Sequence, residues 1–215
     1  MHRVAEEIVA AARKPDNEIA LAQTPGGFGT PPFEHQGRTV QVRVEGAEIV
    51  VDEDGSPRRA PLVSVAEAAA FVGAGLFPKG PPGDRTELGV DPGSAAALGE
   101  FYAFAARTLE ALLATVAPAD EPSPISLWPE HFDLACEAGP ESLGRRATYG
   151  ASPGDAEHPE PYVYVGPWQP QTSGGIWNAT AFAGAELGYA ELLAAEDPEG
   201  LAVDFFTVRR EALAD

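Results

Sequence analysis

The stretch that decides the fold runs from Ile125 to Trp168. From Ile125 to Ala135 it reads Ile-Ser-Leu-Trp-Pro-Glu-His-Phe-Asp-Leu-Ala, and from Ala147 to Trp168 it reads Ala-Thr-Tyr-Gly-Ala-Ser-Pro-Gly-Asp-Ala-Glu-His-Pro-Glu-Pro-Tyr-Val-Tyr-Val-Gly-Pro-Trp. Short runs of β-branched and aromatic residues between Gly/Pro-rich turns are typical of an antiparallel sheet. We therefore expect strands at residues 126–137, 145–151 and 162–165, with a further strand at 177–182.

Helical patterns flank this predicted sheet on both sides. Ser64, with Glu67 three residues later, forms a capping-box signature. Ser94 stands before a long apolar stripe at three- and four-residue intervals and is expected to cap the longest helix. We expect the helices at residues 2–13, 64–73, 94–116, 184–195 and 198–213.

The first third of the chain has the sequence pattern of a β-hairpin preceded by a loop. Val40, Val42 and Val44 alternate with polar residues, and a second run at 48–52 follows a tight turn, which predicts two antiparallel strands. Residues 24–33 hold three glycines and three prolines. That composition predicts a loop and argues against a helix or a central strand.

The predicted fold class is α+β, an antiparallel sheet with helices packed on one face. Residues 78–93 are dense in glycine and proline and are the best candidate for a linker. The chain then divides into an N-terminal strand-hairpin and helix region, 1–90, and a C-terminal α+β region, 91–215. A single domain is the alternative, because 215 residues suit one large domain or two small ones.

Composition narrows the classes of partner. The chain has 33 acidic and 14 basic residues, a formal net charge of −19, and such a surface repels nucleic-acid phosphates and anionic lipids. Cys136 is the only cysteine, so no internal disulfide can form. The sequence shows neither a signal segment nor a run of about 18 apolar residues. We expect a cytoplasmic protein without nucleic-acid or membrane partners.

The predicted strand at 126–137 carries the first candidate site. Alternation along an extended strand places His131 and Asp133 on one face, about 7 Å apart. This spacing suits a histidine that acts as a general base or metal ligand, with an acid that orients it. The candidate catalytic residues are His131, Asp133 and Asp155, in which Asp133 or Asp155 is the orienting partner.

The loop at 152–161 supplies further polar groups near the same strands. Asp155, His158 and Glu160 could join His131 and Asp133 around a divalent metal, and the prolines of the loop would limit the entropy lost on binding. An ordinary Ser-Pro-Gly-Asp turn with an exposed His158 is the alternative interpretation. Candidate contacts to a small-molecule cofactor are Trp168, Trp177 and the backbone at Gly27.

Two more specific enzyme patterns fit poorly. His131-Phe132-Asp133 has the His-x-Asp form of non-haem iron sites, but His158 follows Asp133 too closely for the second histidine of a double-sheet barrel. A hydrolase would need an activated nucleophile, and Cys136 lies on the predicted core face. Paired carboxylates for glycoside chemistry stay open, because any of Glu130, Asp133, Asp155 and Glu160 could face another. With 33 acids such pairs also arise by coincidence, so this signal is not specific.

Three motifs carry a resemblance to a known family. The residues at 127–133, 149–155 and 160–168 resemble a family of bacterial, mainly actinobacterial, proteins of unknown function with a Trp-Pro-x-His-Phe-Asp motif, followed by Ser-Pro-Gly-Asp and Pro-Tyr-x-Tyr. The match covers the C-terminal half, and residues 24–33 extend it towards the N-terminus. The resemblance implies kinship without a specific chemistry.

Two functional hypotheses follow from the sequence. The first is a polar pocket, built around His131, Asp133 and Asp155, that binds a small molecule or a divalent metal. The second is a non-catalytic interaction or structural protein, in which the tryptophan and proline residues specify the fold and the acids form a solvated surface. The sequence decides neither whether the chain is an enzyme nor its oligomeric state.

Overall fold

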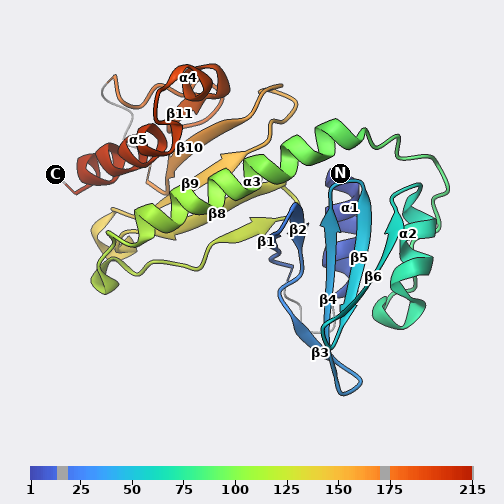
Figure 1. Cartoon of the computed structure of the whole chain (residues 1–215). Helices are drawn as coiled ribbons and strands as arrows, with labels where there is room; N and C mark the ends of the chain where they lie inside the picture. Colours follow the sequence, from blue (N-terminus) through green and yellow to red (C-terminus); the bar gives the residue numbers. More distant parts are fainter. Residues whose placement is uncertain (14–18, 170–174, 215) are drawn as a thin grey trace. The chain divides into compact units, whose positions relative to one another are not determined.

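The computed structural model describes residues 1–13, 19–169 and 175–214. It confirms the α+β class, with two antiparallel sheets and accompanying helices (Figure 1). The chain divides into two compact units: the first comprises Met1–Ala103 with Leu127–Phe132, and the second comprises Phe104–Ser126 with Asp133–Asp215. The expected boundary at residue 90 thus lies inside the first unit.

The first unit is built on a six-stranded antiparallel sheet in the order β1-β2-β4-β5-β6, with β3 also paired to β4. Its strands are β1 (Ala22–Thr24), β2 (Gly27–Gly29), β3 (Phe33–His35), β4 (Arg38–Glu45), β5 (Glu48–Glu53) and β6 (Ser56–Pro61). The β4–β5 hairpin confirms the alternating valine pattern, because Val40, Val42 and Val44 are all buried.

The prediction of a loop at residues 24–33 is wrong for Gly27–Gly29, which form strand β2 between β1 and β4. The glycines that argued against a strand are what allow it to form. A Cβ on Gly27 would lie 2.4 Å from the Val44 carbonyl oxygen, and one on Gly29 would lie 2.4 Å from Arg43 Cβ. Glycine therefore permits β2 to approach β4 closely.

Helices cover one face of this first sheet. The N-terminal helix begins as α1 (His2–Val4) and continues as the π-helical turn η1 (Ala5–Ala10), which contacts both β2 and α2. The predicted helix at Ser64 is confirmed as α2 (Val65–Val72), in which the Ser64 hydroxyl accepts a hydrogen bond from the Glu67 amide at 3.2 Å. It is followed by η3 (Ala74–Leu76). Lys14 and Pro15, which follow the helix expected at residues 2–13, lie outside the described residues.

Residues 78–93, expected as a linker, are tied to the first unit. The Asp84 carbonyl accepts a hydrogen bond from the Ala66 amide, and Leu88 donates its amide hydrogen to the Val63 carbonyl. The Asp84 carboxylate also pairs with Arg3 at 2.7 Å. These contacts hold the segment against α2 and the N-terminal helix.

The longest helix, α3, spans Pro92–Leu113. Ser94 was expected to cap it, but the acceptor at its N-terminus is Asp91, whose Oδ1 takes hydrogen bonds from both the amide and the hydroxyl of Ser94. Asp91 before Pro92 is a favourable start, because proline fits the first helical position. Within the described residues, no helix combines the length and apolarity needed to span a bilayer.

The second sheet runs in the order β11-β10-β9-β8-β7 and is antiparallel through β8 to β11. Its strands are β7 (Ser126–Trp128), β8 (Asp133–Ala138), β9 (Ala147–Ser152), β10 (Tyr162–Pro167) and β11 (Ala185–Gly188), and the single turns η4 (Pro118–Asp120) and η5 (Glu141–Leu143) connect elements. No strand forms at 177–182, where one was expected. The edge strand begins at Ala185 instead.

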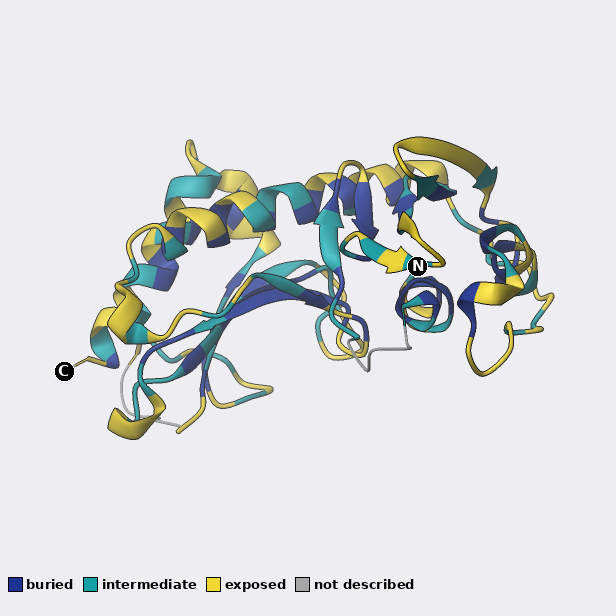
Figure 2. Cartoon of the chain, turned by 90° about the horizontal axis from the view of Figure 1, so that it is seen from below, coloured by how far each residue is buried: buried dark blue, intermediate teal, exposed yellow. Residues whose placement is uncertain are grey.

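Two C-terminal helices, α4 (Tyr189–Ala194) and α5 (Pro198–Ala212), pack against β10 and β11. The predicted helix at 198–213 is confirmed, whereas the one at 184–195 starts later because β11 occupies its first residues. Strands β8 and β9 are largely buried, while most of α5 is exposed or intermediate (Figure 2).

Strand register divides the side chains of the second sheet between two faces. Tyr149 lies opposite Val165 and Cys136, and its ring packs edge-on against Phe206 of α5, which identifies the face covered by helices. Tyr164 lies opposite Gly150 and Glu186 on the other face. Because side chains alternate along strands, Tyr162 shares the face of Tyr164. This second face carries the candidate site.

Candidate functional site

The Trp128–Asp133 motif forms a turn and does not form the continuous strand expected at 126–137. The Trp128 carbonyl accepts hydrogen bonds from the amides of His131, at 3.2 Å, and Phe132, at 2.7 Å. Pro129 lacks the amide hydrogen that a central strand requires, so the chain turns there. The alternation that placed His131 and Asp133 on one face is therefore wrong.

Phe132 anchors this turn in the first unit. Its φ of 56° is unusual for a bulky residue. Its ring lies 5.3 Å from Phe28 and 5.7 Å from Tyr102, both edge-on, and its carbonyl accepts a 2.7 Å hydrogen bond from the Tyr102 hydroxyl. The His2 ring stacks on it at 5.2 Å. These contacts offset the strained backbone, and they leave His131 exposed at the turn.

Asp133 begins β8 in the second unit and is 6% exposed. Its Oδ2 accepts a hydrogen bond from the Tyr164 hydroxyl on the open face of the sheet. Burial, followed by the negative charge of Asp133, raises the pKa of the Tyr164 hydroxyl well above its ordinary value. Tyr164 therefore stays protonated and donates to the carboxylate.

Asp155 organises the loop between β9 and β10. Its Oδ1 accepts hydrogen bonds from the amides of Glu157 and His158, each at 2.8 Å, and its Oδ2 accepts one from the Tyr162 hydroxyl at 2.9 Å. Burial opposes ionisation, but these donors outweigh it and hold the pKa of the Asp155 carboxyl below its usual value. Asp155 is thus an ionised centre that shapes the loop.

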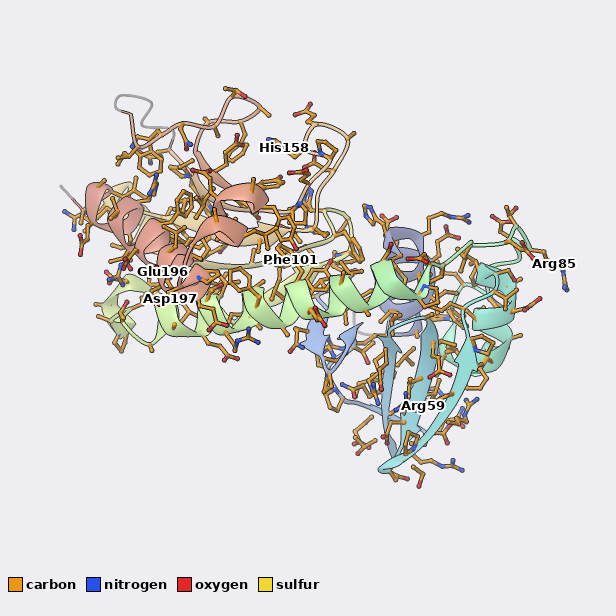
Figure 3. The ribbon with its side chains drawn as sticks, turned by 45° about the horizontal axis from the view of Figure 1, so that its top comes forward. Arg59, Arg85, Phe101, His158, Glu196 and Asp197 are labelled. Carbon is orange, nitrogen blue, oxygen red and sulfur yellow. The ribbon has the colours of Figure 1, made fainter. Side chains whose placement is uncertain are left out.

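His158 ties this loop to the neighbouring edge strand. Its Nε2 lies 3.0 Å from Oε2 of Glu186 on β11, and its Nδ1 lies 3.4 Å from Asp155 Oδ1. The imidazole also packs on the Tyr162 ring, with 4.5 Å between centroids. Figure 3 labels His158 in this loop. Both ring nitrogens therefore face carboxylates of the protein itself.

A surface cavity of about 350 Å³ lies beside His158. One wall is the loop residues 157–161 with Tyr162, and the other is formed by β11 and the first turn of α4. Asn178 supports the second wall, because its side-chain amide both donates to and accepts from the Glu186 backbone at 3.0 Å. The lining residues are Glu157, His158, Pro159, Glu160, Pro161, Tyr162, Asn178, Glu186, Gly188, Tyr189, Ala190 and Glu191.

The structure brings together some of the residues expected from the sequence. Asp155 and His158 are neighbours, and Glu160 lines the cavity. His131 belongs to the other compact unit, so its expected pairing with Asp133 and Asp155 stays a prediction. In the described part of the chain, no three His, Cys, Asp or Glu side chains are grouped so that they could hold a metal ion.

The three expected cofactor contacts lie outside this cavity lining. Gly27 is a buried strand residue whose missing Cβ accommodates β4. Trp168 is 47% exposed at the end of β10, and the Arg146 guanidinium lies 5.2 Å from its ring centroid. Trp177 is half-buried after the second gap in the described residues.

Sequence reasoning missed four residues that build the cavity: Tyr162, Asn178, Glu186 and Tyr189. Tyr162 lies in the predicted strand at 162–165, and strand alternation with Tyr164 places it on the open face. Glu186 gave no signal, because it is 28 residues from His158 and lay in a predicted helix. Only the pairing of β10 with β11 brings the two together.

Comparison of the chain with protein-family models, curated proteins and solved structures found no match.

Proposed function

We propose that this protein binds a small molecule in the cavity between the 157–161 loop and the β11–α4 wall. The observation that carries the proposal is the cavity itself, about 350 Å³ in volume, within the usual range for small-ligand sites. Its walls come from two strands, one helix and a proline-rich loop. Walls held by proline limit the entropy lost when a ligand binds.

The position of His158 favours binding over acid–base catalysis. A general base needs a ring nitrogen that can reach a substrate proton. Here Nε2 is engaged by Glu186, and Nδ1 is buried beside Asp155. The imidazole therefore holds the loop wall in place. Glu157, Glu160 and Tyr189 are exposed and are the groups available to a ligand.

A fragment screen by ¹H–¹⁵N NMR, with a cavity-blocking variant, tests the proposal. Ala190 lines the cavity and is exposed, so Ala190→Trp fills it without disturbing the core. Ala194 is exposed on the same helix outside the lining, so Ala194→Trp is the matched control. We expect binding fragments to shift the amides of Gly188 and Tyr189, and binding to be lost only in Ala190→Trp.

Two results would reject this proposal. One is that no fragment binds to either the wild-type protein or the Ala194→Trp control. The other is that fragments bind equally well to Ala190→Trp, with shifts that map outside the cavity lining.

We also infer that the Trp128–Phe132 part of the motif specifies the fold. The supporting observation is the turn closed on the Trp128 carbonyl and anchored by Phe132 between Phe28 and Tyr102. Substituting Phe132 by Leu should destabilise the first unit, measured by hydrogen exchange, and should leave ligand binding to the folded protein unchanged. Lost binding at unchanged stability would contradict this role.

A further inference from the structure

We propose that the ligand of this cavity is an organic cation, a primary ammonium or guanidinium compound with an apolar body. This inference rests on the proposed function and specifies the chemical class of the ligand. It follows from three properties of the cavity wall: its charge, the partners of its carboxylates, and its aromatic rings.

The charge of the wall is strongly negative and comes from separate elements. Glu157 and Glu160 lie on the loop, Glu186 on β11 and Glu191 on α4. No lysine or arginine is present among the described lining residues, and the imidazole of His158 is already engaged by Glu186. An anionic ligand would therefore face four carboxylates without a cation to receive it.

Two of the four carboxylates have partners within the protein, and the other two are available to a ligand. Glu186 is paired with His158, and Glu191 accepts a hydrogen bond from the Gly188 amide at 3.3 Å. Glu157 and Glu160 form no side-chain hydrogen bond or ion pair within the described residues, and both are exposed. Two carboxylates without protein partners are suited to receive the N–H donors of an ammonium or guanidinium group.

The aromatic rings provide the apolar part of the site. Tyr162 and Tyr189 both line the cavity, the first from β10 and the second from the start of α4. The Tyr162 ring is held by His158, with 4.5 Å between centroids, and by its hydroxyl bond to Asp155. A fixed tyrosine face attracts cations through its quadrupole and gives an apolar ligand body a flat surface.

Three probes of similar shape and different charge test the inference. They are 2-phenylethylammonium, the neutral 2-phenylethanol and the anionic 3-phenylpropionate. Each is titrated into the ¹⁵N-labelled full chain at pH 7 and low salt. We expect only the ammonium probe to shift the amides of Gly188 and Tyr189 in a saturable way, and added salt to weaken its binding.

Variants that remove negative charge show which carboxylates bind the ammonium probe. Replacing both Glu157 and Glu160 by Gln should raise the Kd of the ammonium probe about thirtyfold, because each carboxylate near a cation contributes roughly 1 kcal/mol in water. The control replaces Glu196 and Glu211 by Gln. Both are exposed and lie outside the cavity lining, and the same net charge is removed. Figure 3 labels Glu196 near the start of α5.

The outcomes separate this inference from the proposed function. If 2-phenylethanol or 3-phenylpropionate binds the cavity as tightly as the ammonium probe, the cavity is a ligand site but the charge class is wrong. If both double variants weaken binding equally, the effect is the general negative charge of the protein, and the assignment to Glu157 and Glu160 is wrong. If none of the three probes binds, the inference is rejected.

Discussion

At the scale of single residues, the second sheet contains a half-buried tyrosine, Tyr164, and a buried one, Tyr149, that differ in the hydrogen bonding of their hydroxyl groups. Tyr164 donates to Asp133, whereas the Tyr149 hydroxyl is fully buried and has no hydrogen-bond partner among the described residues. A buried hydroxyl without a hydrogen-bond partner lowers the stability of the folded protein, whereas a hydrogen bond to a carboxylate raises it. The same chemical group thus has opposite effects at the two positions.

The two tyrosine-to-phenylalanine variants should therefore differ in sign. Tyr164→Phe removes a donor from a buried carboxylate and should lower the free energy of unfolding by about 1.5–3 kcal/mol. Tyr149→Phe removes an unpaired hydroxyl and should leave it unchanged or raise it by up to about 1 kcal/mol. Urea denaturation of both variants measures the difference. An equal loss in both would show that Tyr149 has a partner in solution.

Residue type alone predicted part of the site. Asp155 and His158 stood out because the loop at 152–161 groups several possible ligands between prolines, and the structure places these two side by side. His131 stood out because strand alternation would pair it with Asp133, yet it is exposed in the turn that holds Phe132. A motif with rare residues indicates constraint, and that constraint can be steric as well as chemical.

At the scale of elements, the α+β fold class was predictable from the sequence. The strands that were missed have a common cause. Hydrophobic periodicity predicted the β4–β5 hairpin, α2, α3 and α5, since each buries one regular face. It missed β2 and β6, whose glycines and prolines normally oppose strands. β2 uses glycine for close packing, and β6 is an edge strand, where Pro57 and Pro61 are tolerated.

The glycine of β2 gives the element-scale prediction. Gly27→Ala would place a methyl group 2.4 Å from the Val44 carbonyl oxygen, and backbone atoms cannot move aside as a flexible side chain can. We expect a loss of about 1–3 kcal/mol in the free energy of unfolding, typical of overpacking. The control is Gly166→Ala in β10, where no atom lies within 4 Å of the added methyl group.

Thermal unfolding followed by circular dichroism would test this pair. A melting temperature of Gly27→Ala that matches the control would mean that β2 and β4 are not closely paired. In that case Gly27 would again be available as the ligand-lining backbone that the sequence suggested.

At the scale of the whole molecule, one cysteine thiol and two tyrosine hydroxyls make the stability of the protein decrease at alkaline pH. Burial raises the pKa of the Cys136 thiol from 9.0 to about 12, and it raises the hydroxyl pKa of Tyr149 and Tyr164 above 10.0. The folded chain therefore holds protons that the unfolded chain releases. Stability is complete below about pH 9 and falls as the pH rises towards 12.

The loss of stability at alkaline pH should appear as a downward slope in a plot of unfolding free energy against pH. Each such group contributes up to about 1.4 kcal/mol per pH unit between its unfolded and folded pKa. Urea midpoints measured from pH 8 to pH 11 should decrease, and Cys136→Val should flatten the decrease above pH 9. Part of the tyrosinate absorbance at 295 nm should appear only when the protein unfolds. Complete tyrosine ionisation near pH 10 in a folded protein would contradict the predicted burial.

The two compact units divide the chain at points other than residue 90. Breaker-rich residues 78–93 suggested a boundary, but hydrogen bonds to Val63 and Ala66 hold this segment within the first unit. The chain passes between units inside α3 and again on either side of Leu127–Phe132. A continuous helix carries no local signal of such a crossing, because its periodicity is uninterrupted.

We propose that the ligand site is the cavity held by His158, whose lining does not include His131. The most direct measurement is the Kd of one compound selected by the fragment screen, determined for wild type, His158→Ala and His131→Ala. His158→Ala removes the contact to Glu186 and the support of Tyr162, so we predict a Kd at least about tenfold higher, whereas His131→Ala should stay within about twofold of wild type. The reverse order, with binding lost in His131→Ala and kept in His158→Ala, would contradict the claim.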